Sequence, residues 1–239
     1  MPFYFDIFVG MNVSFVLVEP AVPENIGAAA RAIKTMGFSG LRLVNPCEFK
    51  QGKARWVAHA SGEILDDARV FPTLESAVSE IDFVVATSAK TRSVKGDHHP
   101  VEKLPEMILN KKESIASVAV VFGREESGLT NHELRLCHIS TFVPMATRYP
   151  SLNLAQAVML YAYILSPHQG LSENTEDPVS KHKFKAAANE LKVLLAESRI
   201  ARNPNIYNRI FERLALLGDN DINLLMSVMA ALNEKYGKK

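Results

Sequence analysis

The sequence predicts an α/β protein with a mainly parallel sheet, followed by a small α-helical extension. Short apolar runs rich in β-branched residues alternate with stretches of helical periodicity over most of the chain. Two of these runs, Phe83–Ala86 and Val118–Phe122, are apolar at consecutive positions. Such runs are typical of parallel strands that helices cover on both faces, so we expect them at the centre of the sheet.

The expected strands follow one another in the order Asn12–Glu19, Gly40–Asn45, Ala68–Phe71, Asp82–Thr87, Ser117–Gly123 and Ile139–Pro144. Characteristic residues mark the ends of the helices between them. Pro23 begins the first helix and Gly37 closes it. Thr130 and Glu133 have the spacing of a capping box at the start of a later helix. These signals predict structure and say nothing of function.

The segment Ser151–Leu165 contains no charged residue, and its apolar side chains cover much of a helix circumference. We expect a helix that is buried nearly all round, in the core or in an interface, with Ser151 as its N-cap. The following stretch, Ser166–Pro178, has two prolines, Gly170 and small polar residues, which are typical of a linker. We therefore divide the chain into a main domain at 11–167, a linker at 168–180 and an extension at 181–239.

Apolar residues recur at helical spacing in the extension, which predicts two or three amphipathic helices. The stripes are Phe184, Ala188, Leu191 and Leu195, then Ile210, Leu214 and Leu217, then Ile222, Leu225, Met229 and Leu232.

The composition fits a globular main domain with an appendage, because 47% of the 239 residues are hydrophobic and 22% are charged. No apolar stretch is long enough to cross a membrane. The apolar opening, residues 2–9, carries Asp6 and lacks a basic flank, which argues against a secretory signal. We expect residues 1–10 to be an upstream extension and Met11 to begin the folded chain.

Cys47 and Cys137 are too few for a disulfide scaffold and have no metal-like partner at short spacing, so we expect a reducing, cytoplasmic location and no metal site. The net charge of +1 hides an asymmetry between the two parts of the chain. Residues 181–239 hold 11 Lys or Arg against 6 Asp or Glu, whereas residues 1–180 hold 16 against 20. A basic extension can hold RNA phosphates, although solvated helix faces explain the asymmetry equally well.

Familiar nucleotide-binding motifs are absent from the sequence. No G-x-G-x-x-G follows the first strand, and there is no G-K-[ST] loop. The second strand ends at Asn45 rather than at an acidic residue, which further disfavours a dinucleotide enzyme. His98 and His99 form the densest histidine pair, but no further ligand is apparent near them. A solvated loop therefore explains this pair better than a metal site.

Two segments gather small and polar residues where an α/β sheet binds ligands. Glu24–Arg31, at the beginning of the first helix, sets Gly27 and three alanines beside Arg31. This arrangement permits either the close approach of a ligand or ordinary packing of the helix. Val121–Asn131 places two glycines around a pair of glutamates at the carboxyl end of a buried strand, the usual ligand edge of such sheets.

A third segment, Val143–Ala157, contains Asn153, which is a mediocre helix former in an otherwise apolar helix. Together the segments read N-x-G-x-x-x-R, F-G-R-E-x-x-G-L-T and S-L-N-L-A-x-A. In this order and spacing they resemble the three signature motifs of the SpoU/TrmH family of SPOUT RNA ribose methyltransferases. Arg55–Gly62, Ala86–Ala89 and the helical tail resemble its TrmJ/LasT-type subgroup, so the likeness covers most of the chain.

This resemblance implies the SPOUT, or α/β-knot, fold, in which the part from about Phe122 to Leu165 threads a loop and forms a C-terminal trefoil knot. It also implies S-adenosylmethionine as methyl donor, held largely by backbone groups of the knot loops, and no metal. The matching cofactor-binding positions are Thr87, Ser88, Ala89, Gly123, Val143, Pro144, Met145, Ser151 and Leu152. Their apolar members suit the slot that an adenine needs.

The implied reaction is methyl transfer to a ribose 2′-hydroxyl of structured RNA, with tRNA favoured over rRNA because of the subgroup. A ribose hydroxyl is a weak acid, so its attack on the sulfonium methyl needs proton removal and alkoxide stabilisation. In the family the residue matching Arg31 is proposed as the base, but a guanidinium deprotonates so reluctantly that we favour electrostatic stabilisation and phosphate positioning. The matching supports are Asn25, Glu125, Ser151 and Asn153.

Several cations are candidates for a track that holds RNA phosphates: Arg31, Lys90, Arg92, Lys95, Arg124, Arg148 and those of the basic tail. The resemblance also implies a homodimer, for which the charge-free helix Ser151–Leu165 offers a surface, and no membrane partner. Two alternative interpretations stay open. One is a catalytically inactive SPOUT relative that binds RNA as an assembly factor, and the other is a Rossmann-type enzyme acting on a small nucleotide.

Overall fold

A computed structural model describes residues 11–89, 97–146, 152–166, 182–196 and 198–236. Within these residues a seven-stranded sheet has the order β3-β2-β1-β6-β4-β7-β5, and all its neighbouring strands are parallel. The strands are β1 (Asn12–Val18), β2 (Gly40–Val44), β3 (Arg69–Phe71), β4 (Phe83–Thr87), β5 (His98–Pro100), β6 (Ser117–Phe122) and β7 (Ile139–Phe142). The predicted fold class and the predicted central strands are therefore confirmed.

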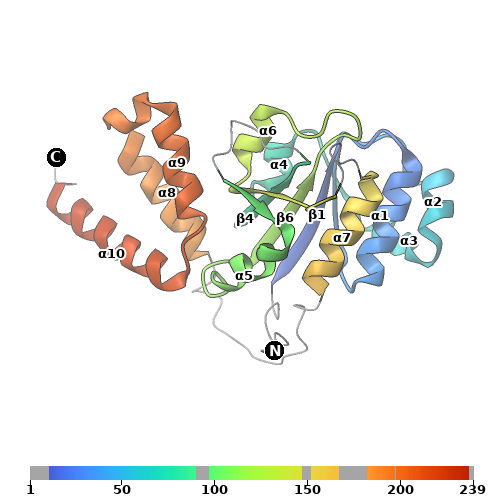
Figure 1. Ribbon diagram of the computed structural model, residues 1–239, viewed down its shortest axis with the longest axis horizontal. Helices are drawn as coiled ribbons and strands as arrows, with labels where there is room; N and C mark the ends of the chain where they lie inside the picture. The colour runs from blue at the N-terminus through green and yellow to red at the C-terminus, as the bar shows by residue number, and fades with distance from the viewer. Residues whose placement is uncertain (1–10, 90–96, 147–151, 167–181, 197, 237–239) are drawn as a thin grey trace.

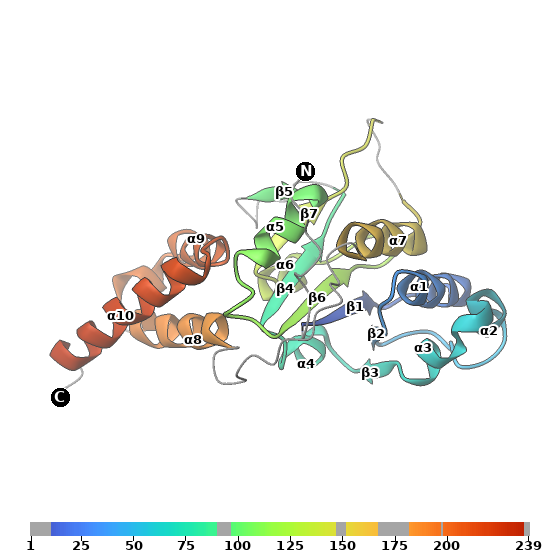
Figure 2. The ribbon, with the colours of Figure 1, turned by 90° about the horizontal axis from the view of Figure 1, so that it is seen from below.

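Helices cover both faces of the sheet (Figures 1 and 2). One face packs against α1 (Pro23–Thr35), α5 (Leu104–Leu109) and α7 (Leu154–Leu165), and the other against α4 (Leu74–Val78) and α6 (Asn131–Leu136). Two short helices, α2 (Lys53–Ala58) and α3 (Gly62–Asp66), lie outside α1. Side chains of β1 alternate between the two faces of the sheet. Phe15 and Leu17 pack into the core on the α1 face, and Val16 and Val18 into the core on the α4 face. Burial on both faces explains why the central strands are apolar throughout.

The edge strand β5 corrects one prediction from the sequence. His98 and His99 do not form a solvated loop but pair with β7, and both side chains are half-buried. The His98 ring stacks on Phe142 with centroids 4.7 Å apart, and its Nδ1 lies 2.9 Å from the Ser140 hydroxyl. Two histidines and a proline carry no strand pattern of their own, so the pairing with β7 determines this strand.

The start of α7 corrects two more predictions. The helix begins at Leu154, and its N-cap is Asn153 rather than Ser151. The Asn153 side chain accepts a hydrogen bond from the Ala155 amide, and Gln156 completes a capping box. Asn153 is therefore a cap and not a weak member of the helix. The helix is also not buried nearly all round, because Gln156 is exposed and 61% of the Tyr163 surface is accessible.

The tail consists of α8 (Lys183–Ala196), the short turn η4 (Arg199–Arg202), α9 (Pro204–Leu214) and α10 (Asp219–Tyr236), as predicted from the apolar stripes. It packs on the end of the main domain beside α5 and β4 (Figure 1). Phe184 is 1% exposed and its ring meets those of Phe83 and His138 edge to face. The core of the main domain therefore continues into the tail.

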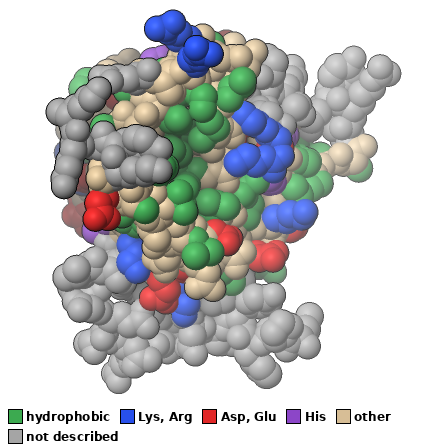
Figure 3. All heavy atoms as spheres, turned by 90° about the vertical axis from the view of Figure 1, so that its left-hand side faces the viewer, with side chains coloured by type: hydrophobic (Ala, Val, Ile, Leu, Met, Phe, Trp, Pro, Cys, Tyr) green, Lys and Arg blue, Asp and Glu red, His purple; other side chains and the backbone are tan. Residues whose placement is uncertain are grey.

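The outer side of the tail carries apolar as well as basic side chains. Val193 on α8 and Leu224, Val228 and Leu232 on α10 are all exposed, although the stripe pattern predicts burial for Leu232. Figure 3 views this end of the molecule, where hydrophobic side chains lie among charged ones. The exposed surface of the tail therefore includes apolar side chains in addition to solvated Lys and Arg. No helix among the described residues has both the length and the apolar character needed to cross a bilayer.

Lys111 is a buried cation where the tail meets the main domain. It is 1% exposed, its Nζ donates to the Leu217 carbonyl, and it lies 5.6 Å and 5.9 Å from the ring centres of Phe83 and Phe184. Burial lowers the pKa of Lys111 to about 8. Asp219 and Asp221 oppose this shift without cancelling it.

We expect this lysine to make stability depend on pH. Between pH 8 and 10 the unfolded chain keeps a proton on Lys111 that the folded chain releases, so the free energy of unfolding rises with pH, by about 2 kcal/mol over this window. The Lys111→Met variant has a side chain of similar volume and should lack this rise. Urea unfolding of both proteins at several pH values checks the difference, and parallel curves would contradict the lowered pKa.

Candidate active site

The structure joins the three sequence motifs directly through side-chain hydrogen bonds. Asn25 lies in the first turn of α1, Glu125 follows β6, and Asn153 caps α7. Asn25 Nδ2 donates to Glu125 Oε1 over 3.1 Å, and Asn153 Nδ2 donates to Asn25 Oδ1 over 2.8 Å. These bonds span 100 and 128 residues of sequence. We call Asn25, Glu125 and Asn153 the Asn25 cluster.

Two glycines make this convergence possible. A Cβ on Gly123 would lie 2.2 Å from the Gly128 carbonyl carbon, so this position accepts no side chain. The turn that follows is closed by two backbone hydrogen bonds between Arg124 and Gly128, and Gly128 has a φ of 69°. The turn presents Glu125 toward α1, where the Ala21 amide also donates to its carboxylate over 3.3 Å.

Gly27 serves helix packing, one of the two roles that its small neighbours suggested. A Cβ at this position would lie 2.0 Å from the Ala54 carbonyl oxygen, so α2 presses on α1 at this point. Because α2 occupies that side of α1, a ligand cannot approach the backbone of Gly27 from there.

The electrostatics of the cluster favour a charged Glu125. Burial acts to raise its pKa, but hydrogen bonds from Asn25 and from the Ala21 and Val22 backbone outweigh burial and lower the pKa below the ordinary value. The carboxylate is therefore ionised at neutral pH. An ionised carboxylate only accepts hydrogen bonds, so Asn25 must direct its amide nitrogen to Glu125 and its oxygen to Asn153.

Seven of the nine predicted cofactor positions lie at the carboxyl ends of strands, at the same edge of the sheet. Thr87 is the last residue of β4 and is followed by Ser88 and Ala89, Gly123 follows β6, and residues 143–145 follow β7. Because β6, β4 and β7 are parallel neighbours, these carboxyl ends lie side by side. Thr87 Oγ1 donates to the Val121 carbonyl over 3.0 Å, and the Ser88 amide donates to the Thr141 carbonyl over 2.9 Å. Val143, Met145 and Leu152 are half-buried, while Ala89 and Pro144 are exposed.

Comparison with known proteins identifies the family. Residues 12–163 match the SpoU rRNA Methylase family, and this match includes the whole Asn25 cluster. The chain belongs to the SpoU family. It is 41% identical to the uncharacterized tRNA/rRNA methyltransferase LasT of Escherichia coli over 95% of this chain and 100% of that protein.

Two further relatives are similar over most of their length. The tRNA (cytidine/uridine/adenosine-2′-O-)-methyltransferase TrmJ of Pseudomonas aeruginosa is 36% identical over 95% of this chain and 86% of its own. The crystal structure of TrmJ from Z. mobilis superposes with a TM-score of 0.63 and 31% identity, over 92% of this chain and 98% of that chain. The α/β fold of this SpoU family member is therefore that of the SPOUT methyltransferases.

Arg31 stands apart from the Asn25 cluster in this SpoU family protein. It lies on the exposed side of α1, nearly two turns beyond Asn25, and forms no ion pair or hydrogen bond with the residues that the structure describes. The structure thus brings Asn25, Glu125 and Asn153 together but does not bring Arg31 into contact with them. An exposed guanidinium keeps its donors available for an anionic ligand.

Arg124 is the predicted RNA contact that the structure corrects. Its guanidinium donates to both oxygens of Glu19 and both oxygens of Glu133 over 2.7–3.0 Å, and to the Gly128 carbonyl over 3.4 Å. These bonds use all five N–H groups, so none is left for a phosphate. Arg124 instead fixes the turn that carries Glu125. The other predicted positions Ser151, Lys90, Arg92, Lys95 and Arg148 lie outside the described residues.

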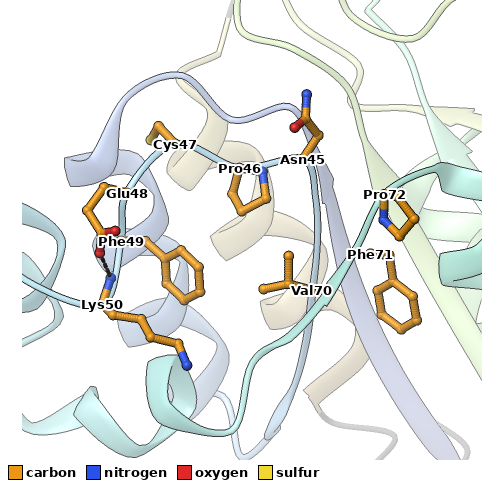
Figure 4. A pocket seen from close by; sticks show the side chains of 9 residues that line it. All are labelled: Asn45, Pro46, Cys47, Glu48, Phe49, Lys50, Val70, Phe71 and Pro72. Atoms are coloured by element: carbon orange, nitrogen blue, oxygen red, sulfur yellow. Dashed lines mark hydrogen bonds between the residues drawn. The ribbon is translucent and has the colours of Figure 1, made fainter.

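A cavity of about 570 Å³ includes none of the predicted cofactor residues in its lining (Figure 4). It is lined by Asn45, Pro46, Cys47, Glu48, Phe49, Lys50, Val70, Phe71 and Pro72, at the ends of β2 and β3. The sequence indicated only that the second strand ends at Asn45. No group of His, Cys, Asp and Glu within the described ranges is arranged to hold a metal ion.

Proposed function

We propose that this SpoU family member transfers the methyl group of S-adenosylmethionine to a ribose 2′-hydroxyl in tRNA. The observation that carries the proposal is the Asn25 cluster, because one polar residue from each of the three motifs takes part in it. Such a cluster at the carboxyl edge of a parallel sheet, with an exposed arginine further along α1, supplies groups that orient a hydroxyl and stabilise developing negative charge.

The ends of β4, β6 and β7 fit S-adenosylmethionine. Half-buried Val143, Met145 and Leu152 form an apolar surface for the adenine, while the strand ends present backbone groups. When bound, the cofactor supplies an electrophilic methyl group on a sulfonium. The trefoil knot implied by the resemblance would bring these loops together around it.

Arg31 holds an RNA phosphate and stabilises the 2′-oxygen while the hydroxyl proton passes to solvent water. Glu125 fixes Asn25 by accepting from its amide, and Asn153 donates to Asn25 from the other side. With both neighbours in place the Asn25 side chain has a single orientation, which positions the cluster rigidly beside the substrate. Ser151, next to this cluster in sequence, supplies a further hydroxyl.

RNA would reach the site along Lys90, Arg92, Lys95, Arg148 and the basic tail. We also propose a homodimer, because α7 carries exposed Tyr163 and half-buried Met159, Leu160 and Ile164 on its outer side. A tRNA substrate is favoured over rRNA because TrmJ, to which the chain is similar over 95% of its length, is named for tRNA. Such a substrate is met in the cytoplasm, as the cysteine content also predicts.

A methyl-transfer assay tests the function. The protein is incubated with S-adenosylmethionine carrying a labelled methyl group and with total tRNA or ribosomal RNA, and the modified nucleotide is mapped. We expect label in tRNA as a 2′-O-methylnucleoside, and none in the same RNA made with a 2′-deoxynucleotide at the mapped position. Label on a base would contradict the proposed chemistry. Binding of RNA without any methyl transfer would favour the inactive assembly factor, and transfer to a small nucleotide without RNA would favour a Rossmann-type enzyme.

A further inference from the structure

The edge strand β5 lies between the proposed cofactor site and the tail. Toward the sheet, the His98 ring stacks on Phe142, the last residue of β7, and is hydrogen-bonded to the Ser140 hydroxyl. The same ring lies against the backbone of Ser88 at the end of β4. His98 therefore contacts two of the three strand ends that form the proposed site, immediately before Val143 and at Ser88 itself.

On the side of the tail, two arginines of α9 hold the residue that precedes β5. Arg209 Nη1 lies 3.0 Å and Arg213 Nη1 3.2 Å from Asp97 Oδ2. The two arginines are four residues apart, so they project from the same side of α9. Figure 2 shows α9 beside the β5 end of the sheet. We call Asp97, Arg209 and Arg213 the Asp97 clamp.

Each histidine of β5 has one ring nitrogen, Nε2, that takes no part in holding the strand. The Nε2 atoms of His98 and His99 are both buried, and neither forms a hydrogen bond to a described residue. Buried polar atoms usually have a partner, so an unused one near a ligand site points to a ligand or a water that completes it. Of the two atoms, the Nε2 of His98 belongs to the ring that lies beside Phe142 and Ser140.

We propose that the tail, through the Asp97 clamp, holds β5 against the end of β7, and that His98 is thereby a positioning residue for the S-adenosylmethionine-binding segments at Ser88 and Val143–Met145. This inference rests on the proposed function. It gives the helical tail a role in cofactor affinity in addition to any contact with RNA. A three-residue edge strand paired on one side has little stability of its own, so contacts on its open side determine how firmly it is held.

The clamp should act on cofactor binding and not on the chemical step. A site that is held in its binding conformation binds more tightly than one that must first be ordered. Arg31 and the Asn25 cluster lie on α1, α7 and the turn after β6, and no described contact joins them to Asp97. Loss of the clamp should therefore raise the Kd for S-adenosylmethionine while kcat at saturating cofactor stays unchanged.

The test compares two double variants by isothermal titration with S-adenosylmethionine. Arg209→Ala with Arg213→Ala removes the clamp, and Arg199→Ala with Arg202→Ala is the matched control, since it removes the same charge from the exposed turn η4 of the same tail. We expect the clamp variant to bind the cofactor about threefold to tenfold more weakly, the range for the loss of two partly exposed ion pairs. The control variant should bind as the wild type does.

Further variants keep the inference falsifiable if the double substitution disturbs the fold. Asp97→Asn preserves shape and should weaken binding similarly, and it should add nothing in the clamp variant because both changes break one interaction. His98→Ala should raise the KM for S-adenosylmethionine without lowering kcat. Equal Kd values for the clamp, Asp97→Asn and control variants would overturn this inference alone, whereas a wild type that binds no S-adenosylmethionine would contradict the proposed function itself.

Discussion

Replacing Arg31 by alanine is expected to lower kcat for RNA methylation by about a hundredfold or more, the usual cost of removing one group that stabilises charge in a transition state. The side chain is exposed on α1 and forms no hydrogen bond or ion pair with a described residue, so the fold should not depend on it. Binding of S-adenosylmethionine should also be preserved, because the proposed cofactor residues lie at the ends of β4, β6 and β7. Single-turnover methylation and cofactor titration measure the two effects separately.

Two further variants separate the role of Arg31 from a general loss of charge. Arg31→Lys keeps a cation without the planar fork that grips a phosphate, so partial activity is expected. Arg135→Ala removes another exposed arginine, from α6 on the opposite face of the sheet, and should leave turnover unchanged. If Arg31→Ala turned over like Arg135→Ala, Arg31 would have no part in the mechanism.

Replacing Phe184 by alanine is expected to lower the free energy of unfolding by about 3–5 kcal/mol, as for other fully buried phenylalanines. Its ring packs edge to face with Phe83 at 5.6 Å and His138 at 5.0 Å, in the core that the tail shares with the main domain. The resulting cavity would lie where α8 joins the sheet, so the tail should also become more sensitive to protease. Urea denaturation and limited proteolysis measure these changes.

Val193→Ala is the control for this prediction, because Val193 lies on the same helix with 74% of its surface exposed. Its stability should stay within about 0.5 kcal/mol of the wild type. A Phe184→Ala protein as stable as this control would mean that the tail is not docked on the main domain in solution.

The parts of the fold that local pattern controls were predictable. Central strands such as Ser117–Phe122 are apolar at almost every position, and the capping box of Thr130 and Glu133 is local in sequence, so both predictions are confirmed. The start of α7 was placed at Ser151 instead of Asn153, because both residue types make good caps and only the geometry chooses between them. The strand β5 was missed because its residues have no strand pattern of their own and it forms through pairing with β7.

The candidate site was likewise predictable only in part. Motif spacing was sufficient to select Asn25, Glu125, Asn153 and Arg31, but it could not tell which of them touch. Arg124 looked like a free cation in the sequence, and only the folded chain brings Glu19 and Glu133 to it from distant segments.

The amino-acid sequence by itself determined the family, the central strands and the candidate site residues, because periodicity and motif spacing are properties of the chain alone. The tertiary structure decided how those residues combine: the bonds within the Asn25 cluster, the engagement of Arg124, and the approach of the tail to β5. The physical reason is that hydrogen bonds and ion pairs act over about 3 Å, and only folding brings groups a hundred residues apart within that distance.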